Sequence, residues 1–363
     1  MNPSADGSDS QLELSKFLYA AIPNGSDTAG AKLSGSRRLL RPLHVKMTIS
    51  SRLVKVLVLL LFPVTSCVRT PPSVDPTIGR SPTLRVQLED GTVTRLEIEE
   101  YVVGSILAEA DIRDLDRTTI ERVVQTQAIL ARTYALANRN RHQSDGFDLC
   151  STTHCQVYRS TEHLSPRNAD ISRFAATSTA GLVITHSGIP INAVFHADCG
   201  GSTSNSEVAW GGITPPYLRA VDDSFCLLDN PVSWQFTASQ KELLATLNTD
   251  ARTRIGNQLH GFQISEKDGS GRVQQLLVHS DESSKLRGEV FREVITRRFG
   301  PNSLKSTRFT VRRQGNDFIF EGRGWGHGIG LCQRGAAARA RAGQAPSQIL
   351  NHYYHDTSLT QYY

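Results

Sequence analysis

The sequence has little or nothing of several features that define common classes of protein. Only 7% of its 363 residues are aromatic, and no basic stripe with interleaved aromatic residues appears, so nucleic acid is not an expected partner. The G-x-S-x-G motif is absent, which argues against a serine nucleophile. No internal repeat is present. The apolar run Val54–Phe62 is too short to span a membrane.

The net charge of +5 is misleading about most of the chain. Residues 1–66 carry eight Lys and Arg against four Asp and Glu, which leaves 32 basic and 31 acidic residues beyond them. The remainder is therefore close to neutral. Its apolar content is ordinary, so a globular fold is expected there.

The first part of the chain predicts export rather than a folded unit. Residues 1–46 are polar and rich in Gly and Ser, which predicts a disordered extension or a mis-assigned start ahead of Met47. Residues 47–66 place basic residues before an apolar run and small residues after it, the pattern of a secretory signal. Residues 67–82 are rich in proline and predict an extended tether.

The sequence Val-Thr-Ser-Cys that ends at Cys67 resembles the bacterial lipobox, in which the cysteine is lipidated and becomes the mature N-terminus. The alternative is a cleaved signal followed by an incidental cysteine. We therefore expect a protein of the periplasm or cell envelope that contacts a membrane only through a lipid anchor.

Residues 83–363 predict a single α+β domain of antiparallel hairpins and helices around a cleft. The predicted strand pairs are Leu84–Leu88 with Val93–Leu96, Leu182–Thr185 with Ile191–Phe195, Phe262–Ser265 with Val273–Val278, and Phe309–Arg312 with Phe318–Glu321. The predicted helices begin near Ile98, Thr118, Val290, Gln333 and Pro346.

Glu109 ends the apolar stripe of the first predicted helix. The stripe consists of Ile98, Tyr101, Val102, Ser105, Ile106 and Glu109. An unpaired buried carboxylate is costly. Glu109 therefore either turns out to solvent or lies at the wall of a cleft with a raised pKa, the condition of a general acid. Asp111 is the nearest second carboxylate, but a continuing helix would point it away from Glu109.

The second predicted helix, roughly Thr118–Arg139, carries a polar residue on its inner face. Thr118 or Thr119 is expected to cap it. Its inner stripe consists of Ile120, Val123, Val124, Gln127, Ala131, Tyr134 and Asn138. We expect Gln127 to be buried and hydrogen-bonded.

The segment Glu321–Ala337 has glycine at every second position from 322 to 330. In an extended strand these glycines would leave one face of the backbone bare, so something is expected to approach that face closely. The segment is not a dinucleotide fingerprint, because His327 occupies the place of its third glycine. The alternative is a glycine-rich turn before a surface helix.

One loop gathers residue types suited to zinc: His142, Cys150, His154 and Cys155. Four protein ligands would make such a site structural. The alternative is a Cys150–Cys155 disulfide, which an oxidising exported compartment would favour. Among the other cysteines, Cys199–Cys226 is a candidate bridge and Cys332 the odd thiol.

Several distinctive motifs follow one another between about residues 84 and 360. They are EYVVGSILAEA, QTQAILARTYALA, CSTTHCQVY, FHADCGGSTSNSEVAWGG with PYLRAVDD, and GWGHGIGLCQRGA with ILNHYYHDTSL. In these motifs and their order the chain resembles the SpoIID/LytB family of bacterial cell-wall proteins.

The resemblance implies a lytic transglycosylase with Glu109 as its single catalytic residue. Such enzymes cut between N-acetylmuramic acid and N-acetylglucosamine in glycan strands stripped of stem peptides, and leave a 1,6-anhydro end. The sugar's own 6-hydroxyl attacks, so catalysis needs no second carboxylate and no cofactor. Some family enzymes hold a structural zinc through two Cys and two His in the loop of His142 and Cys155.

Other family members enhance an N-acetylmuramoyl-L-alanine amidase, so a non-catalytic wall-binding partner of such an amidase is the alternative function. A wall-tethered scaffold is a third. The chain departs from the family at Ala110-Asp111, where Met-Pro is usual, at Cys332, where Ser is usual, and at His355-Asp356, where Pro-Gly is usual.

The expected glycan contacts come from two distant parts of the chain. His327 and Gln333 are expected to hold sugar hydroxyls or N-acetyl groups, with Trp325 as a stacking face. Ser202, Thr203 and Trp210 are expected to line the groove. Arg132 is expected to fix the Glu109 helix to its neighbours rather than touch the substrate.

Overall fold

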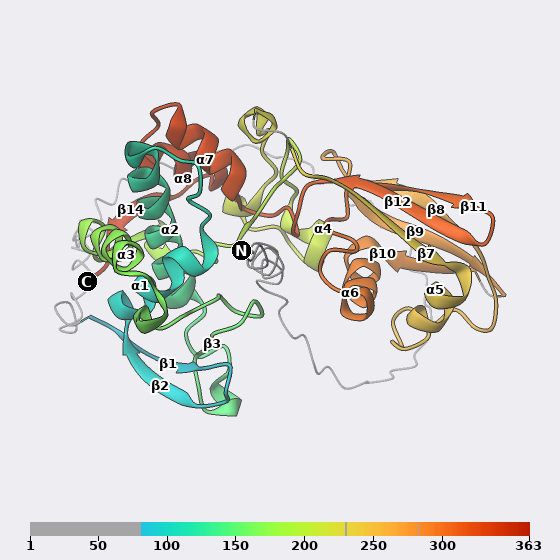
Figure 1. Ribbon diagram of the computed structural model, residues 1–363, viewed down its shortest axis with the longest axis horizontal. Coiled ribbons are helices and arrows are strands. Elements are labelled where there is room, and N and C mark those ends of the chain that lie inside the picture. The colour runs from blue at the N-terminus through green and yellow to red at the C-terminus, as the bar shows by residue number, and fades with distance from the viewer. Residues whose placement is uncertain (1–80, 229–230, 282) are drawn as a thin grey trace, which may run out of the picture. The chain divides into compact units, whose positions relative to one another are not determined.

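The computed structural model describes residues 81–228, 231–281 and 283–363 (Figure 1). The predicted extension, the predicted signal, the predicted lipidation site Cys67 and nearly all of the predicted tether lie outside these residues. Within them, no helix combines the length and the apolar character needed to cross a bilayer.

The described chain contains eight α-helices and fourteen strands. The helices are α1 (Ile98–Glu109), α2 (Arg117–Ala137), α3 (Pro166–Ser178), α4 (Ser206–Trp210), α5 (Gln240–Leu247), α6 (Gly288–Phe299), α7 (Gln333–Arg341) and α8 (Pro346–Tyr353). The first seven strands are β1 (Thr83–Gln87), β2 (Val93–Glu97), β3 (Leu149–Cys150), β4 (Leu182–His186), β5 (Ile189–Pro190), β6 (Phe195–His196) and β7 (Ser233–Ser239). The others are β8 (Leu259–Lys267), β9 (Val273–Ser280), β10 (Ser284–Arg287), β11 (Phe309–Gln314), β12 (Asp317–Arg323), β13 (Leu331–Cys332) and β14 (Ser358–Gln361).

The strands form small sheets in the orders β2-β1-β3, β10-β9-β8, β11-β12-β7, β13-β6 and β14-β4-β5. Pairing is antiparallel except between β1 and β3 and between β13 and β6. Separate helices and mainly antiparallel sheets confirm the predicted α+β class. Three predicted hairpins are also confirmed, β1–β2, β8–β9 and β11–β12.

The fourth predicted hairpin is shorter than expected. Ser187 and Gly188 turn the chain with positive φ, but β5 ends at Pro190 and residues 191–194 do not form a strand with β4. Phe195 and His196 instead pair in parallel with Leu331 and Cys332. The chain leaves β4 at this point because it has to reach the glycine-rich segment.

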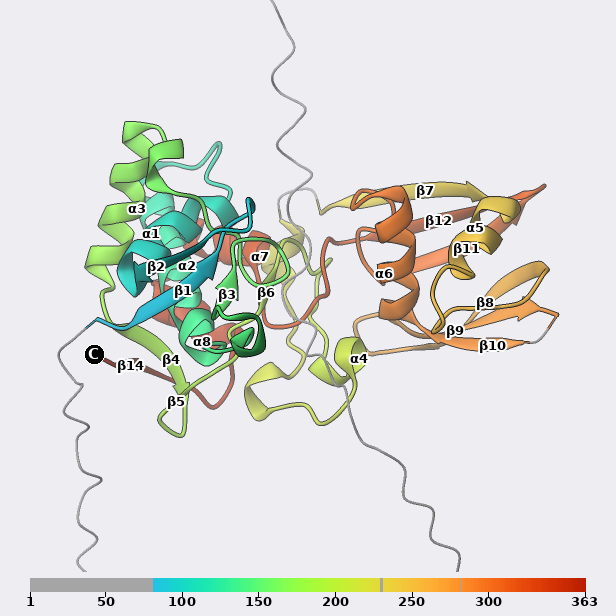
Figure 2. The same ribbon diagram turned by 90° about the horizontal axis from the view of Figure 1, so that it is seen from below.

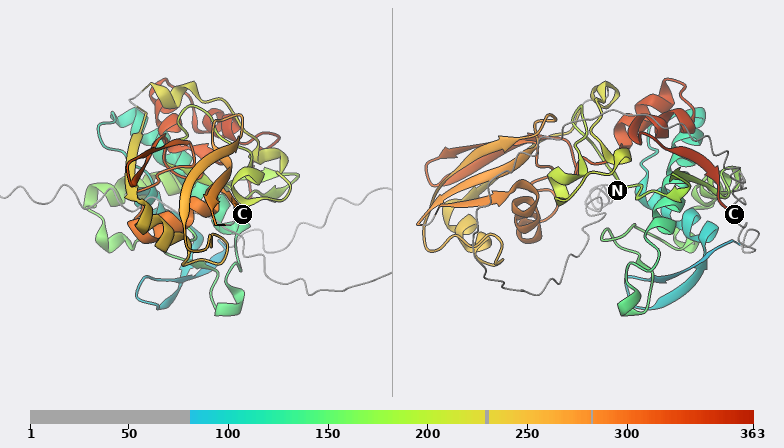
Figure 3. Two further views of the ribbon diagram at one scale, coloured as in Figure 1. Left: turned by 90° about the vertical axis from the view of Figure 1, so that its right-hand side faces the viewer. Right: turned by 180° about the vertical axis from the view of Figure 1, so that it is seen from behind.

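Helix α2 is the centre of the first hydrophobic core. Residues 126–135 of this helix are buried on every side, and the helix contacts α1, α3, α7 and α8. Figure 3 shows α7 and α8, in red, close to the green-blue helices of the first half of the chain. Asp116 caps α2 by accepting a hydrogen bond from the N–H of Thr119, so the predicted cap at Thr118 or Thr119 is wrong by two or three residues.

A second hydrophobic core lies in the middle of the chain. It is formed by β7–β12 with α5 and α6, which lie beside the strands in Figure 2. Phenylalanine rings pack edge to face within it, with centroids of Phe262 and Phe318 4.9 Å apart. The first core takes its residues from 84–226 and 329–354, and the second from 234–320. The second core is therefore an insertion into the chain of the first.

The glycine-rich segment is not the extended strand that its alternation predicted. Strand β12 ends at Arg323, and Gly324, Gly326, Gly328 and Gly330 all have positive φ, between 67° and 102°. The predicted close approach does occur, but the neighbour is the chain itself. A Cβ on Gly324 would lie 2.8 Å from the carbonyl oxygen of Asp198, and one on Gly330 would lie 2.1 Å from that of Val194.

Replacing Gly330 by alanine should destabilise the protein more than a matched glycine replacement elsewhere. Gly315 has a similar φ, 62° against 67°, but a Cβ there meets nothing within 4 Å. Gly315→Ala should lower the free energy of unfolding by about 1–2 kcal/mol, the cost of the left-handed conformation. Gly330→Ala should lower the free energy of unfolding by about 1–3 kcal/mol more than Gly315→Ala does, because the backbone at Val194 has to move.

Urea denaturation of both variants measures the difference. Equal losses in Gly315→Ala and Gly330→Ala would show that the contact with Val194 is not as tight as described.

Candidate active site

Glu109 is the last residue of α1, and its side chain is 8% exposed. Its Oε1 accepts a hydrogen bond of 2.7 Å from the backbone N–H of Val157. Burial raises the pKa of Glu109 to about 8, against the smaller opposing effect of this hydrogen bond. The carboxyl group is therefore protonated at neutral pH, as a general acid must be.

Glu109 lines a pocket of about 430 Å³, a volume within the range of small-molecule sites. The pocket is built by the end of α1, by α2, by Ala197 and Asp198, and by residues from Trp325 to Arg341. Val232 and Lys305, from the sequence around the second core, complete it. The acid and the last motif therefore face one pocket, as the sequence predicted, although side chains rather than bare glycines form its walls.

Gln333 joins the last motif directly to the acid-bearing helix. Its Nε2 donates a hydrogen bond of 3.0 Å to the backbone oxygen of Glu109 and lies 3.5 Å from Oε1 of Gln127. Gln127 is buried as predicted, but its own Nε2 has no hydrogen-bond partner among the described residues. A buried donor without a partner is costly. Gln127 lines the pocket as a residue, but this nitrogen atom is itself buried.

Asp111 lies closer to the chemistry than predicted. Helix α1 ends at Glu109, so Asp111 is beyond the helix and lines the same pocket. Arg113 lies 2.6 Å from its carboxylate, and this hydrogen bond lowers the pKa of Asp111. The pocket thus contains the protonated Glu109 and the ionised Asp111, together with Asp198, whose pKa burial raises to about 6.

Trp325 lines the pocket, with the ammonium group of Lys305 4.7 Å from its ring centroid. His327 does not line it and is 9% exposed. Its Nε2 lies 3.0 Å from the backbone oxygen of Phe195, and its Nδ1 accepts the N–H of Ile329 at 3.0 Å. Both ring nitrogens are therefore engaged with the backbone, and the prediction that His327 holds a sugar is corrected.

Three further residues predicted to line the groove lie elsewhere. Ser202 forms an isolated β-bridge with Asp222, and Oγ1 of Thr203 accepts the N–H of Val221 at 2.8 Å. These contacts hold the loop after Cys199 against the segment before Cys226. The ring of Trp210 lies 5.3 Å from that of His327. None of the three lines the pocket of Glu109.

Arg132 has the position expected of a structural residue. Its side chain is fully buried, and it lies 2.6 Å from the carboxylate of Glu99 on α1. It also donates hydrogen bonds to the backbone oxygens of Ala176 and Leu182. Arg132 thus fixes α1 to the end of α3 and the start of β4.

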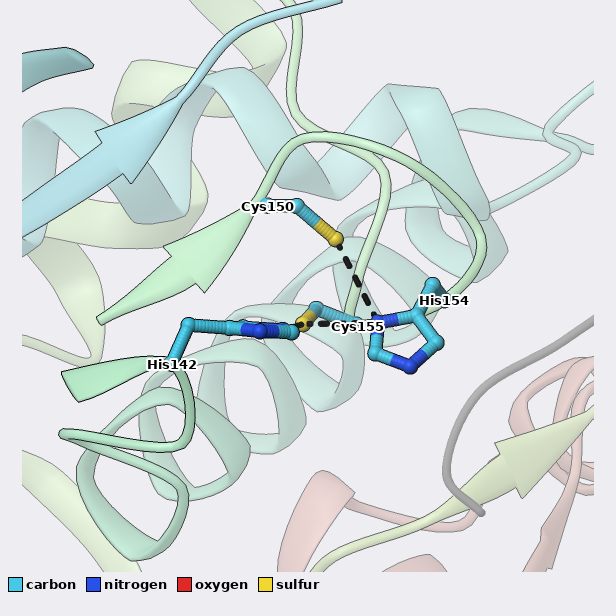
Figure 4. Close-up of side chains that lie close together, drawn as sticks. All are labelled: His142, Cys150, His154 and Cys155. Carbon is cyan, nitrogen blue, oxygen red and sulfur yellow. Dashed lines mark hydrogen bonds between the residues drawn. The ribbon is translucent and has the colours of Figure 1, made fainter. Parts of the chain in front are cut away.

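The four residues proposed for zinc come together in the structure (Figure 4). One ligand atom from each of His142, Cys150, His154 and Cys155 lies within 4.8 Å of the others. Nδ1 of His154 is 3.6 Å from the sulfur of Cys150 and 3.7 Å from that of Cys155. Tetrahedral zinc with these ligands requires about 3.5 Å between sulfur and nitrogen. The group has the composition and spacing to hold a metal ion, and no disulfide joins its cysteines.

Two contributors were not predicted from the sequence, one to the Cys/His loop and one to the surroundings of Glu109. One is Asp145, whose carboxylate lies 3.3 Å from Nδ1 of His142 and so turns Nε2 toward Cys155. Its position three residues after the histidine was the available signal. The other is the backbone N–H of Val157, for which no side-chain pattern exists.

Comparison with known proteins finds two family models, which match different parts of the chain. A family model described as "Stage II sporulation protein" (SpoIID) matches residues 88–186, which include α1, α2 and the Cys/His loop. A second model, "Domain of unknown function (DUF8618)", matches residues 229–330, the segment that carries the second core.

Three curated relatives are similar over much of the chain. An uncharacterized protein of Brachyspira hyodysenteriae is 29% identical over 74% of this chain and 68% of its own length. Stage II sporulation protein D of Bacillus amyloliquefaciens is 24% identical over 81% of this chain and 83% of its own. The amidase enhancer of Bacillus subtilis is 26% identical over 66% of this chain, but only 38% of its own length is matched.

The structure combines an α+β fold with a pocket around one buried acid. In sequence the chain is similar to the SpoIID/LytB family, through the family model over residues 88–186 and through relatives named Stage II sporulation protein D and amidase enhancer.

Glu109 should make the stability of the protein depend on pH. Its pKa is raised from 4.5 to about 8 on folding, so the folded state binds more protons than the unfolded state between these values. The stability that protonated Glu109 allows is therefore present at low pH and lost as pH rises from 4.5 to about 8. At about 1.4 kcal/mol per pKa unit, the loss is on the order of 4 kcal/mol.

The measurement is urea denaturation of wild type and Glu109→Gln across this pH range. Glutamine can still accept the N–H of Val157 but does not ionise, so the variant should become increasingly more stable than wild type as pH rises. Parallel pH profiles for the two proteins would contradict the raised pKa.

Proposed function

We propose that this protein is a peptidoglycan lytic transglycosylase that cleaves between N-acetylmuramic acid and N-acetylglucosamine in denuded glycan strands. The observation that carries the proposal is the buried Glu109, whose pKa of about 8 keeps it protonated at the wall of the pocket. Similarity to the family supports the same class of reaction.

Glu109 performs both proton transfers. Its carboxyl group first protonates the glycosidic oxygen, and the bond to the anomeric carbon of N-acetylmuramic acid breaks. The resulting carboxylate then takes the proton from the 6-hydroxyl of the same sugar as that oxygen bonds to the anomeric carbon. No water is consumed, and the product carries a 1,6-anhydro ring. The N–H of Val157 stabilises the carboxylate between the two steps.

The charge of the pocket fits denuded glycan. Arg113, Lys305, Arg334 and Arg341 line it together with the protonated Glu109 and two aspartates. N-acetylmuramic acid without its stem peptide exposes a free lactyl carboxylate, whereas a peptide converts this group to a neutral amide. A cationic wall therefore favours the denuded strand.

His142, Cys150, His154 and Cys155 would hold a structural zinc ion, because their donor atoms and spacing fit one. Zinc there would fix the fold of the loop and supply no chemistry to the reaction. Val157 follows the last ligand by two residues. The site is thus placed to hold the N–H that faces Glu109. We also propose export and lipid anchoring at Cys67, which the sequence of residues 47–67 supports.

Substitution of the two carboxyl groups distinguishes a transglycosylase from a water-using glycosidase. Glu109→Gln should reduce release of product from denuded sacculi by at least about 100-fold, because the proton donor is lost. Asp111→Asn should leave most of the activity, and mass spectrometry should find 1,6-anhydro ends. Asp111 is partly exposed and its pair with Arg113 is at the surface, so this control should fold normally.

The opposite result identifies a hydrolase. If Asp111→Asn abolished activity as well and the product ended in a reducing N-acetylmuramic acid, Asp111 would be the base that activates water. Equal product from wild type and Glu109→Gln would remove Glu109 from the mechanism.

A second candidate function is enhancement of an N-acetylmuramoyl-L-alanine amidase. The relative named amidase enhancer supports it. In that case the pocket would bind glycan while the partner performs the chemistry.

The two functions predict different behaviour of the protein alone. As a transglycosylase it should release saccharides with 1,6-anhydro ends from denuded glycan with no amidase present. If product formed only after amidase was added, and Glu109→Gln enhanced the amidase as well as wild type, the protein would be an enhancer.

A further inference from the structure

A second group of metal-ligating side chains lies in the first core, apart from the Cys/His loop. It consists of Cys199, Asp223, Cys226 and Cys332, which we call the thiol cluster. All four are buried, and one ligand atom from each lies within 4.8 Å of the others. They come from three segments: the loop after β6, the 3-10 helix Ser224–Leu227 with the residue before it, and the residue before α7.

The spacing of the thiol cluster is that of a tetrahedral zinc site. Zn–S bonds of about 2.3 Å and Zn–O bonds of about 2.1 Å require about 3.8 Å between two sulfurs and about 3.6 Å between sulfur and oxygen. The sulfurs of Cys226 and Cys332 are 3.6 Å apart, and the sulfur of Cys199 is 3.5 Å from Oδ2 of Asp223. A disulfide needs about 2.05 Å. All five described cysteines are free thiols, so the candidate disulfide between Cys199 and Cys226 is not formed in this structure.

Backbone N–H groups point at the sulfurs. The sulfur of Cys332 accepts the N–H of Cys199 at 3.2 Å and that of Gly335 at 3.4 Å. The sulfur of Cys199 accepts the N–H of Gly201 at 3.3 Å. A neutral thiol is a weak acceptor, and buried backbone donors normally find strong ones. Three such donors on two sulfurs are therefore better matched by thiolates, the form that binds metal.

The carboxylate of the thiol cluster is oriented by its neighbours. The hydroxyl of Tyr353 donates to Oδ2 of Asp223 at 2.7 Å, and the guanidinium of Arg339 lies 3.4 Å from Oδ1. Hydrogen bonds that fix a ligating carboxylate are the usual surroundings of a metal site. Gly335 leaves the space for this arrangement, because a Cβ there would lie 2.0 Å from Oδ2.

We propose that Cys199, Asp223, Cys226 and Cys332 form a second, structural zinc site. The three sulfurs and one carboxylate oxygen fill the four positions of tetrahedral zinc, so no position is open for substrate. Thiolate-rich sets favour zinc over magnesium or calcium. Cys332, which stands where the family usually has serine, supplies the ligand that completes the set.

The site would hold one wall of the active-site pocket. Cys332 is the N-cap of α7, and Gln333, the next residue, donates to the backbone oxygen of Glu109. Cys199 follows Asp198, which also lines the pocket. The ion would therefore tie the start of α7 to the loop after β6, next to two residues that line the pocket.

Metal content tests the proposal without any measure of activity. The protein is reduced, loaded with Zn²⁺, desalted and analysed by inductively coupled plasma mass spectrometry. Wild type should hold two equivalents per chain, Cys150→Ser one and Cys332→Ser one, and the double variant none. Serine differs from cysteine only by oxygen in place of sulfur, so Cys332→Ser should fold, and circular dichroism checks this.

Cobalt provides an independent readout. Co²⁺ added to reduced Cys150→Ser should give the absorption of a thiolate-bound tetrahedral ion, and the further change Cys332→Ser should remove it. One equivalent of zinc in wild type, with Cys332→Ser unchanged from it, would overturn the proposal. So would peptide mapping of unreduced protein that found Cys226 in a disulfide with Cys199 or Cys332. If Cys332→Ser does not fold, the zinc content of Cys150→Ser decides the matter, because one equivalent there supports the thiol cluster and none overturns it.

Discussion

A buried carboxyl group imposes the main constraint on this structure. Glu109 keeps its proton at neutral pH only while water is excluded, so α1 has to pack tightly against the segment that carries Val157. The ring of Tyr101 stacks on that of Tyr158 at 5.6 Å, and its hydroxyl donates to Gln156. Gly104 permits this approach, since a Cβ there would lie 2.4 Å from the backbone oxygen of Arg159. Close packing of α1 is thus what gives the acid its pKa.

Distant segments have to meet for the pocket to exist. Gln333 reaches the backbone of Glu109 from α7, while the segment after Gly324 is held against the loop after β6 by glycines that tolerate positive φ. The two Cys-rich groups, one in the Cys/His loop and one before α7, lie in the segments that carry these contacts. Both groups lie largely in loops, where few hydrogen bonds of regular secondary structure are present to hold the chain. A metal ion bound by such a group would fix its loop.

Much of the fold followed from local pattern. The apolar stripe of α1 left two positions for Glu109, in solvent or at the wall of a cleft, and the structure has the second. Alternation with turn residues predicted the β1–β2 and β11–β12 hairpins. Alternation failed at the glycine segment, because glycine adopts conformations that the period-two rule does not include. It failed again for His327, whose ring nitrogens contact the backbone of Phe195, remote in sequence, and of the nearby Ile329. The N–H of Val157, like any backbone donor, leaves no trace in residue identity. The thiol cluster combines an aspartate and three cysteines whose proximity only the tertiary structure reveals.

Because the second core is inserted into the chain of the first, the pocket of Glu109 is completed only by residues late in the sequence. Glu109 lies before the insertion and Gln333 after it, and Val232 and Lys305 of the matched segment 229–330 reach the same pocket. A chain that lacks its C-terminal part therefore holds Glu109 in an incomplete pocket, because Trp325 and the residues of α7 are missing from its wall. The pocket is complete only when the chain up to Arg341 is present, which couples formation of the pocket to an intact polypeptide.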